Sequence, residues 1–220
     1  MRFLLNPSSY TLSDPSSVPN LLVQHLTIVG IAMGVALVVA LPLGVLVARY
    51  RRLYLPVVGV AGFMYTIPGL ALLAVLVPIT GLGPVTIIVP LVLYAQLVLI
   101  RNTAAAILAV DPLVLDVGRA VGMTRIQLLR RVVAPLALPL LIAGVRVATV
   151  TTIGIASLAS LVGAGGLGDL IFGSIQNANY DEVFAGGAVI AAVAVLADWL
   201  LLAVEAAAGR WRTLRTVSRS

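Results

Sequence analysis

The chain has 220 residues, of which 61% are hydrophobic and 10% are charged, and its formal net charge is +6. Soluble domains are close to half apolar and a quarter charged, so this composition excludes an ordinary soluble domain and indicates an integral membrane protein. The 14 basic residues are all arginine and flank apolar segments, which is typical of membrane proteins rather than of nucleic-acid binders, and the absence of cysteine excludes disulfides and thiolate metal sites.

Five apolar segments are long enough to cross a bilayer as helices, for which about 20 residues are needed. They cover residues 21–48, 55–78, 85–109, 135–162 and 183–208. A Gly- and Pro-rich turn at 79–84 joins the second to the third, and a glycine-rich, mildly acidic connection at 163–182 joins the fourth to the fifth. The sequence therefore predicts an all-α integral membrane protein with about five transmembrane helices. We expect one transmembrane domain at 21–208, an extracytoplasmic segment at 1–20 and a basic tail at 209–220.

The arginines are divided unequally between the two ends of these segments, and this sets the expected orientation. Eleven fall on one side, namely Arg49, Arg51, Arg52, Arg119, Arg125, Arg130, Arg131, Arg210, Arg212, Arg215 and Arg219, and only Arg2 falls on the other. By the positive-inside rule, the N-terminus lies outside and the C-terminus is cytoplasmic. Residues 1–20 have no apolar core and are not expected to be a cleavable signal peptide. Five spans without an internal repeat also argue against folds built from two inverted halves.

The polar stretch at 111–135 interrupts an otherwise apolar sequence and predicts two short cytoplasmic helices. Asp111 is a good N-cap and Pro112 suits the first helical position, so a helix is expected to begin there. Gly122 can end it in the left-handed conformation. Thr124 and Gln127 have the spacing of a capping box, which predicts the start of a second helix.

The second short helix is expected to end at Pro135, where the next span begins. Arg130 and Arg131 then fall in its last turn, where cations interact favourably with the helix dipole. Two short helices joined at a glycine form a compact unit that can dock into a groove of a partner. The alternative is a lipid-facing loop whose arginines contact anionic headgroups, and the helix signals alone do not separate the two.

Three charged residues lie within predicted spans, at Arg101, Arg146 and Asp198. From the helical rise, Arg146 and Asp198 both lie about 15 Å from the cytoplasmic ends of their spans. Charges in hydrocarbon usually pair or face water, so we expect an Arg146–Asp198 contact with Arg101 near the same layer. The alternative is that each arginine snorkels separately to the interface. Glu205 lies close enough to the interface to need no functional role.

Proline and glycine interrupt the second span at Pro68 and Gly69. A proline bends a membrane helix and frees a carbonyl, so this position is either a broken helix that lines a path or an ordinary kink that aids packing. Thr66 can bond the freed backbone groups. The glycine run at 163–168 is too flexible for a straight span, and Asp169 after it is expected to begin a short helix toward residue 176.

The remaining polar and aromatic residues predict no catalytic centre. His25 is the only histidine and is expected to be an interfacial polar residue, so a transition-metal site is not expected. Tyr65 and Tyr94 can line a pore, but the aromatics are too scattered for a cage that binds quaternary ammonium. No phosphate-cradling GxxxxGK[ST] loop is present, so this chain does not supply an ATP site.

The stretch at 111–135 resembles the cytoplasmic motif of binding-protein-dependent ABC transporter permeases. That motif reads Glu-Ala-Ala, three residues, Gly, nine residues and Ile-x-Leu-Pro. Here Asp116-Val117-Gly118 is followed by Gly122 and then by Val132-Val133-Ala134-Pro135, so the spacing of Gly and Pro matches. The acid is Asp instead of Glu, and the alanines, Ile and Leu of the motif are replaced by Val, Gly, Val and Ala.

Further stretches at 66–84, 100–112 and 157–176 resemble the permeases of compatible-solute importers, which carry glycine betaine, choline, carnitine or proline. The resemblance implies a multi-pass protein of the bacterial cell membrane that works with a second permease copy or a paralogue. It also implies an extracytoplasmic binding protein and cytoplasmic ATPase subunits, which bind ATP and Mg while this chain binds no cofactor and catalyses no reaction.

The resemblance also implies roles for particular residues. Coupling to the ATPase is expected at Asp116, Gly118, Arg119, Gly122, Thr124, Gln127 and Pro135. A translocation path is expected to involve Tyr65, Pro68, Gly69, Tyr94, Gly165, Gly166 and Asp169, because the glycine-rich segment borders the pore mouth in that family. A plain solvent loop is the alternative for that segment.

Other classes of function stay open at this point. Within the same family, a permease for methionine or another small nutrient shares the fold and the cytoplasmic motif. An ion-coupled carrier or channel should have internal repeats or several buried acids, of which only Asp198 is present. A small membrane enzyme would need a catalytic constellation that the sequence does not contain.

Overall fold

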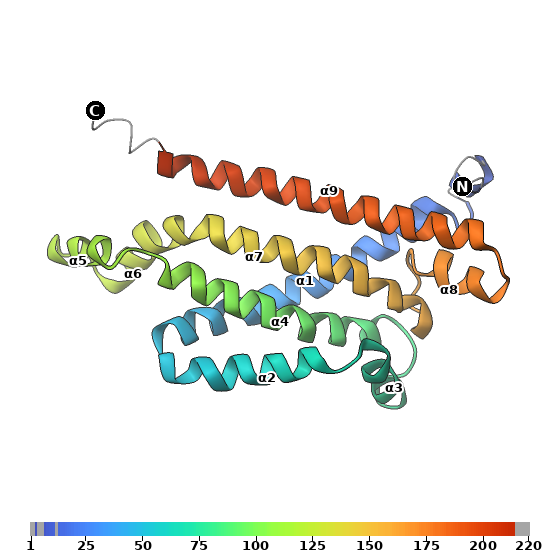
Figure 1. Cartoon of the computed structure of the whole chain (residues 1–220), viewed down its shortest axis with the longest axis horizontal. Helices are drawn as coiled ribbons and strands as arrows, with labels where there is room; N and C mark the ends of the chain where they lie inside the picture. The colour runs from blue at the N-terminus through green and yellow to red at the C-terminus, as the bar shows by residue number, and fades with distance from the viewer. Residues whose placement is uncertain (1–2, 4–6, 12, 214–220) are drawn as a thin grey trace.

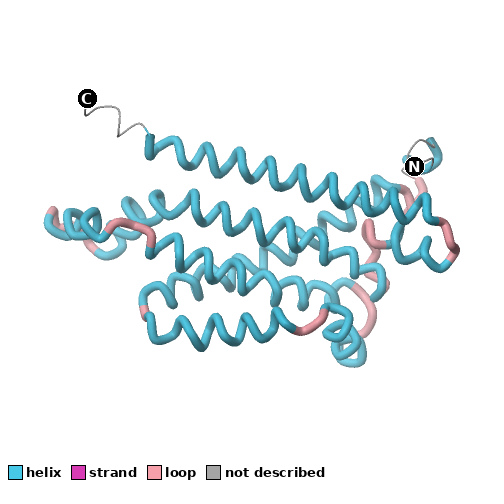
Figure 2. Tube along the Cα trace, in the orientation of Figure 1, coloured by secondary structure: helices cyan, strands magenta, loops and turns pink. Residues whose placement is uncertain are grey.

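A computed structural model describes residues 3, 7–11 and 13–213, and this part of the chain is helical and contains no strand (Figure 2). Its longer helices are α1 (Val18–Arg49), α2 (Tyr54–Thr66), α3 (Gly69–Thr80), α4 (Pro84–Leu108), α5 (Pro112–Ala120), α7 (Ala134–Ile155), α8 (Asp169–Gln176) and α9 (Tyr180–Thr213). Short helical segments complete it, namely η2 (Pro7–Tyr10), η3 (Arg51–Leu53), α6 (Arg125–Leu128), η4 (Leu129–Val133) and η5 (Ala156–Val162).

Helices α1, α4, α7 and α9 form the bundle, in which α4 packs against both α1 and α7, and α9 packs along α7 (Figure 1). Small residues allow these helices to approach closely. Close packing is usual between membrane helices, because the lipid is as apolar as the side chains and the hydrophobic effect does not drive the helices together. Ala36 and Ala40 of α1 are fully buried. A Cβ on Gly44 would overlap Thr103 of α4, and a Cβ on Gly144 would overlap Asn102.

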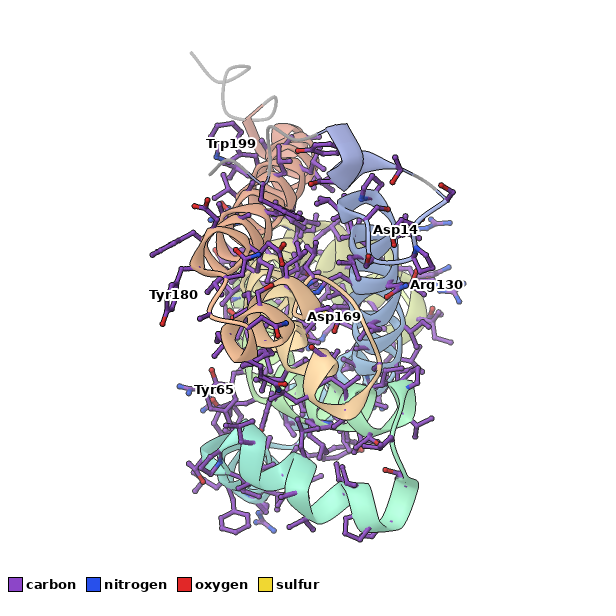
Figure 3. The ribbon with its side chains drawn as sticks, turned by 90° about the vertical axis from the view of Figure 1, so that its right-hand side faces the viewer. Asp14, Tyr65, Arg130, Asp169, Tyr180 and Trp199 are labelled. Atoms are coloured by element: carbon purple, nitrogen blue, oxygen red, sulfur yellow. The ribbon has the colours of Figure 1, made fainter. Side chains whose placement is uncertain are left out.

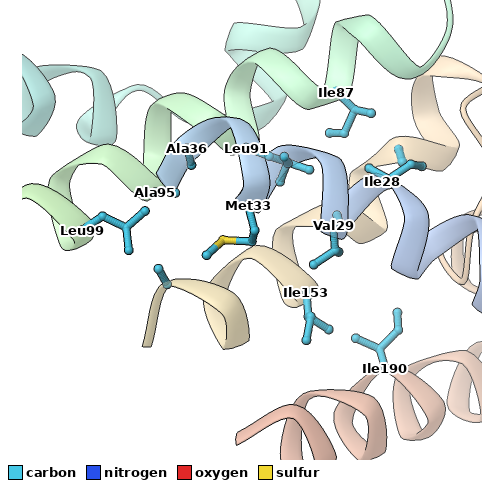
Figure 4. Packing of buried hydrophobic residues seen from close by; sticks show 14 of the residues in the cluster. Ile28, Val29, Met33, Ala36, Ile87, Leu91, Ala95, Leu99, Ile153 and Ile190 are labelled. Carbon is cyan, nitrogen blue, oxygen red and sulfur yellow. The ribbon is translucent and has the colours of Figure 1, made fainter. Parts of the chain in front are cut away.

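Larger apolar side chains fill the space between these close approaches (Figure 4). Ile28 and Met33 of α1 lie against Ile87 and Leu91 of α4, and Ile153 extends the cluster to α7. Helix α9 contributes little to this core, because only 6% of its membrane-spanning window is buried, compared with 50% for α4. One side of the bundle is therefore a packed core, whereas α9 leaves most of its surface uncovered.

The expected span at 55–78 is broken. Helices α2 and α3 meet at an angle of 91°, so the structure has four helices that are long and apolar enough to cross a membrane, or five if this bent pair counts as one span. The break falls at Ile67 and Pro68, where Ile67 is extended and Pro68 has no N–H to continue the helix. The helix is therefore broken at Pro68 and not merely kinked, whereas its lining of a path stays a prediction.

The expected end of a helix at Pro135 is wrong, because α6, η4, α7 and η5 run on as one helical segment from Arg125 to Val162. The stretch before this proline, Leu129–Val133, is π-helical. A proline removes a hydrogen bond and clashes with the carbonyl four residues earlier, and the wider π-turn accommodates it without a break. Arg130 and Arg131 consequently lie inside a continuous helix and not in the last turn of a short one.

The two ends of the bundle differ in what they carry (Figure 1). Helices α5 and α6, the turn between α1 and α2, and the C-terminal end of α9 lie at one end, whereas α3, α8 and the N-terminus lie at the other. The first end therefore carries Arg49, Arg51, Arg119 and Arg125, and by the positive-inside rule it stays the predicted cytoplasmic end. Arg2, Arg215 and Arg219 lie outside the described residues.

Candidate functional sites

The first candidate site is the knob, which we define as α5 and α6 with their caps, residues 111–128. Asp111 Oδ1 accepts a hydrogen bond of 2.8 Å from the N–H of Leu113, which confirms it as the N-cap of α5. Thr124 Oγ1 accepts from the N–H of Gln127 at 3.3 Å, and Gln127 Oε1 accepts from the N–H of Thr124 at 2.8 Å. This reciprocal pair is the predicted capping box.

Gly122 closes α5 in the predicted left-handed conformation, with a φ of +80°. Its N–H donates to the carbonyl of Arg119 at 3.0 Å, and the next residue, Met123, donates to the carbonyl of Gly118 at 3.1 Å. These two bonds form a Schellman motif, which satisfies the last carbonyls of the helix and reverses the chain. The turn between the two short helices is therefore a defined structure and not a flexible link.

Gly118 allows the two helices of the knob to touch. A Cβ at this position would lie 2.5 Å from Leu128 Cδ1, so a side chain here requires Leu128 to shift. By contrast, Asp116 and Arg119 form an ion pair of 2.7 Å on the outer surface, where their side chains are 67% and 63% exposed. The knob is consequently a packed pair of helices, and its charged residues are free to contact a partner.

The knob also carries an exposed apolar stripe, which the sequence analysis missed. Leu113, Val117 and Val121 are 67%, 56% and 69% exposed and recur every four residues, and Ile126 of α6 is 64% exposed. Residues four apart share one face of a helix. The spacing of Leu113, Val117 and Val121 was the signal available, because a polar insert with an apolar stripe that its own bundle does not cover is typical of a docking surface.

The second candidate site is the elbow, which we define as residues 66–69 between α2 and α3. The hydroxyl of Tyr94 on α4 donates to the carbonyl of Ile67 at 2.8 Å and so satisfies a backbone group that the break leaves free. The ring of Tyr65 meets that of Tyr94 edge to face, with 5.9 Å between centroids. Gly69 lies beneath the same ring. The structure thus brings Tyr65, Pro68, Gly69 and Tyr94 together.

Thr66 fills the bonding role expected for it. Its Oγ1 donates to the carbonyl of Phe63 at 2.7 Å, within the last turn of α2. Since a backbone group in hydrocarbon must be satisfied internally, this bond and the one from Tyr94 account for how the helix can stop inside the membrane region. The elbow is therefore stabilised from α4 as well as from α2 itself.

The third candidate site is the outer turn, residues 163–168. Gly165 and Gly166 have φ values of +75° and +91°, which other residues adopt at a cost. The N–H of Gly166 donates to Gln24 Oε1 of α1 at 3.0 Å, and a Cβ on Gly165 would overlap that side chain. Asp169 begins α8 as expected, and Figure 3 places it near the centre of this end of the bundle.

His25 is not interfacial, as had been expected, but completely buried. Its Nε2 lies 3.0 Å from the carbonyl of Ile153 on α7, and its ring lies against Gly166. The residue therefore joins α1 to α7 and to the outer turn. A single polar residue near the start of a span looks interfacial in sequence, because the burial of His25 depends on segments more than a hundred residues away.

The elbow and the outer turn lie toward the same end of the bundle but form separate clusters. They are linked through η5, since Leu158 of that segment lies next to Gly69. The seven residues expected to line a translocation path are thus divided, with Tyr65, Pro68, Gly69 and Tyr94 at the elbow and Gly165, Gly166 and Asp169 around Gln24 and His25.

The expected contact between Arg146 and Asp198 is present, with Nε and Oδ1 2.8 Å apart. Glu205 joins it, because its Oε2 lies 3.0 Å from Arg146 Nη1. Two carboxylates therefore share one guanidinium, and the contact of Glu205 was not predicted. Arg101 is not part of this cluster but borders a hollow together with Arg51 and Tyr54. Across the described residues, no group of three metal-ligating side chains is placed to hold an ion.

Comparison with known proteins adds to this geometry. Residues 40–210 match the family described as "Binding-protein-dependent transport system inner membrane component". The choline transport system permease protein OpuBD of Bacillus subtilis is 40% identical over 217 residues, which cover 98% of this chain and 96% of that protein. The osmoprotectant import permease protein OsmW of Salmonella typhimurium is 37% identical over 197 residues, covering 87% and 92%.

A solved structure shares the fold. The permease chain of the inward-facing MetNI methionine ABC transporter superposes with a TM-score of 0.75 at 26% identity, covering 85% of this chain and 94% of that one. The likeness extends over most of both chains, so the two proteins share one overall fold.

Proposed function

Because the chain belongs to the family of binding-protein-dependent transport system inner membrane components, we propose that it is the permease subunit of an ATP-driven importer of osmoprotectants such as glycine betaine, choline, carnitine or proline. The observation that carries this proposal is the similarity, over nearly the whole chain, to permeases named for choline and for osmoprotectants. A permease for methionine is the second candidate, favoured by the structural likeness to the methionine transporter.

The proposed importer has three other kinds of component. Cytoplasmic ATPase subunits bind ATP and Mg, because this sequence has no phosphate-binding loop. A second permease copy or a paralogue completes the pore, and an extracytoplasmic binding protein delivers the solute. Substrate selection is assigned to that binding protein, since the aromatic side chains of this chain do not form a cage for a quaternary ammonium group.

The knob is proposed to couple ATP hydrolysis to transport by docking in a groove of the ATPase. The roles of Asp116, Gly118, Arg119, Gly122, Thr124, Gln127 and Pro135 in coupling are part of this proposal. The apolar stripe supports it, because Leu113, Val117 and Val121 present one uncovered face. The close packing at Gly118 supports it further, since a unit that transmits movement must not deform within itself.

The translocation path is proposed to pass the elbow and the outer turn. A helix that breaks within the membrane exposes backbone groups only where protein or a water-filled cavity covers them. Two observations favour the elbow as part of the path, the 91° bend at residues 67–68 and the aromatic pair of Tyr65 and Tyr94 beside it. The cluster of Arg146, Asp198 and Glu205 is proposed to fix α9 against α7 and not to bind solute.

The test is uptake of labelled glycine betaine into proteoliposomes that contain this permease, its ATPase and its binding protein. Unlabelled choline, carnitine, proline and methionine serve as competitors. The proposal predicts ATP-dependent uptake that a quaternary amine blocks. The Val117→Glu variant tests the docking role of the knob in the same assay. It places a charge on the exposed stripe without changing the packing of the knob, and it should lower uptake and ATPase stimulation together.

The outcomes separate the alternatives. Uptake of methionine alone, with ATP dependence, would keep the architecture and overturn the substrate. Uptake that needs no ATP in a verified complex would overturn the importer and favour an ion-coupled carrier or channel. A change of transported solute when only the permease is exchanged between two systems would overturn the assignment of selection to the binding protein.

A further inference from the structure

Helix α2 packs against α4 but hardly touches α1, and an apolar groove lies between the three helices. Of the eleven residues that line this groove, only Gln96 is polar, and the others include Val39 and Leu43 of α1 and Val57 and Val60 of α2. The groove is open on one side. It faces the region that the hydrocarbon of the membrane would occupy, since α1 and α4 are spanning helices.

A basic hollow lies nearer the end of the bundle that carries the knob, and its Tyr54 and Arg101 directly follow Leu53 and Ile100 of the groove in the chain. It is bordered by Val47, Tyr54, Arg51 and Arg101. Val39, Leu43 and Val47 lie four residues apart on α1, so the groove and the hollow share one face of that helix. We call the two together the trough. From the helical rise, Val39 and Val47 are about 12 Å apart, which is close to the depth of one leaflet, about half of the 30 Å hydrocarbon core.

The arginines at the basic end of the trough have no acidic partner. Arg49 and Arg52 flank Arg51 around the turn η3, and Arg49 lies over the ring of Tyr50 at 5.6 Å. None of these side chains forms an ion pair within the described residues, nor does Arg101. The acids nearest this end are engaged elsewhere, with Asp111 capping α5, Asp116 on Arg119, and Asp198 and Glu205 on Arg146.

We propose that the trough binds one anionic phospholipid, with its phosphate on Arg51 and Arg101 and an acyl chain in the apolar groove. The charge favours an anionic lipid over a second copy of this chain, because a second copy would place these arginines against arginines. The arrangement also differs from general attraction to a membrane surface. The arginines are joined to an apolar groove of one leaflet's depth, so headgroup and tail are recognised together.

The experiment uses the full chain, purified with its ATPase from vesicles of equal phosphatidylglycerol and phosphatidylcholine. Lipid retained per permease after detergent exchange is measured by mass spectrometry. The wild type should retain phosphatidylglycerol over phosphatidylcholine. The double variant Arg51→Gln/Arg101→Gln should lower that retention roughly 25-fold, since each arginine near a surface contributes about a factor of five. The single variant Arg130→Gln removes a charge at the same end but away from the trough, and retention should not change.

A second variant tests the tail. Val60 is 64% exposed at the groove, so Val60→Trp fills the groove without disturbing the core, and it should also lower phosphatidylglycerol retention. The proposal is overturned by equal retention of the two lipids in the wild type, by an equal loss in Arg130→Gln, or by full retention in Val60→Trp. Displacement of the lipid by millimolar inorganic phosphate would also overturn it, because the site would then be a simple phosphate site.

Discussion

The knob and the elbow both interrupt the spanning helices. The knob is stabilised by contacts between residues close in the sequence, whereas the elbow is stabilised by a contact between residues far apart in the sequence. In the knob, each cap is a hydrogen bond between residues two to five apart, from Asp111 to the Schellman motif at Gly122. In the elbow, the carbonyl of Ile67 is satisfied by Tyr94, 27 residues away. The outer turn depends on Gln24, 142 residues away. A segment held by local contacts can move as a unit, whereas one held by distant contacts changes only when its neighbours move.

The largest expected effect is that of Gly122→Pro. Proline holds φ near −65° and has no N–H, so it cannot adopt the φ of +80° or donate to Arg119. The knob should lose its turn, at a cost of about 3 kcal/mol or more. Uptake should then fall to background while ATP hydrolysis no longer responds to the binding protein. The control is Gly122→Asn, because asparagine tolerates the left-handed conformation and should retain most uptake. Normal transport by the proline variant would contradict the docking role of the knob.

The second-largest effect is expected at the cluster of Arg146, Asp198 and Glu205. Its Arg146–Asp198 contact was predicted from the sequence although the two residues lie far apart in the chain. Arg146→Asp places three carboxylates together and should lower assembly of the protein severalfold, because a charge in the membrane needs a partner. The double variant Arg146→Asp/Asp198→Arg restores one pair and should recover part of that loss. Recovery is measured as the yield of monodisperse protein. A double variant that assembles no better than either single change would show that the pair is not a stabilising contact.

Gly166→Val tests the outer turn. A β-branched residue at a φ of +91° is strained, and its Cβ would lie 3.3 Å from His25 Nδ1. The expected cost is about 1–3 kcal/mol, visible as a lower unfolding temperature. Gly173→Val is the matched control, because Gly173 lies within α8 with no atom in contact range of an added Cβ. An equal fall in unfolding temperature for both variants would show that the loss comes from adding a β-branched side chain anywhere in this region, and not from the conformation of the turn.

How far apart in the sequence the contacting residues lie also decides which features could be predicted from the sequence. Asp111, Gly122 and the Thr124 capping box were predicted because the residues that make each structure are neighbours in the chain. The bend at Pro68 was one of two predicted alternatives, and the choice depended on Tyr94. The burial of His25 was mispredicted because its partner, Ile153, is 128 residues away in the sequence. The continuous helix through Pro135 was mispredicted because a π-turn cannot be recognised from amino-acid composition. Arg146 and Asp198 were paired correctly because depth in a membrane can be counted along each helix.

Tyr94→Phe sharpens the comparison at the elbow. The change removes one hydroxyl and leaves the ring contact with Tyr65, so the carbonyl of Ile67 loses its partner in a partly buried position. An unsatisfied buried group costs about 1–3 kcal/mol, and the elbow should become less rigid. Uptake should fall severalfold while ATP hydrolysis still responds to the binding protein, which is the opposite of the pattern expected for the knob. Loss of both together would show that elbow and knob act as one unit.

The smallest effect is expected for Asp116→Asn, although Asp116 occupies the acidic position of the resembled motif. Its ion pair with Arg119 is 67% and 63% exposed, and exposed pairs contribute about 0.2–1 kcal/mol. Stability should therefore hardly change, and any larger fall in uptake would have to come from a contact with the ATPase. Arg119→Gln is the matched control, because it breaks the same pair from the other side. If both variants lower uptake equally, the pair itself shapes the knob; if only Asp116→Asn does, the carboxylate contacts the partner directly.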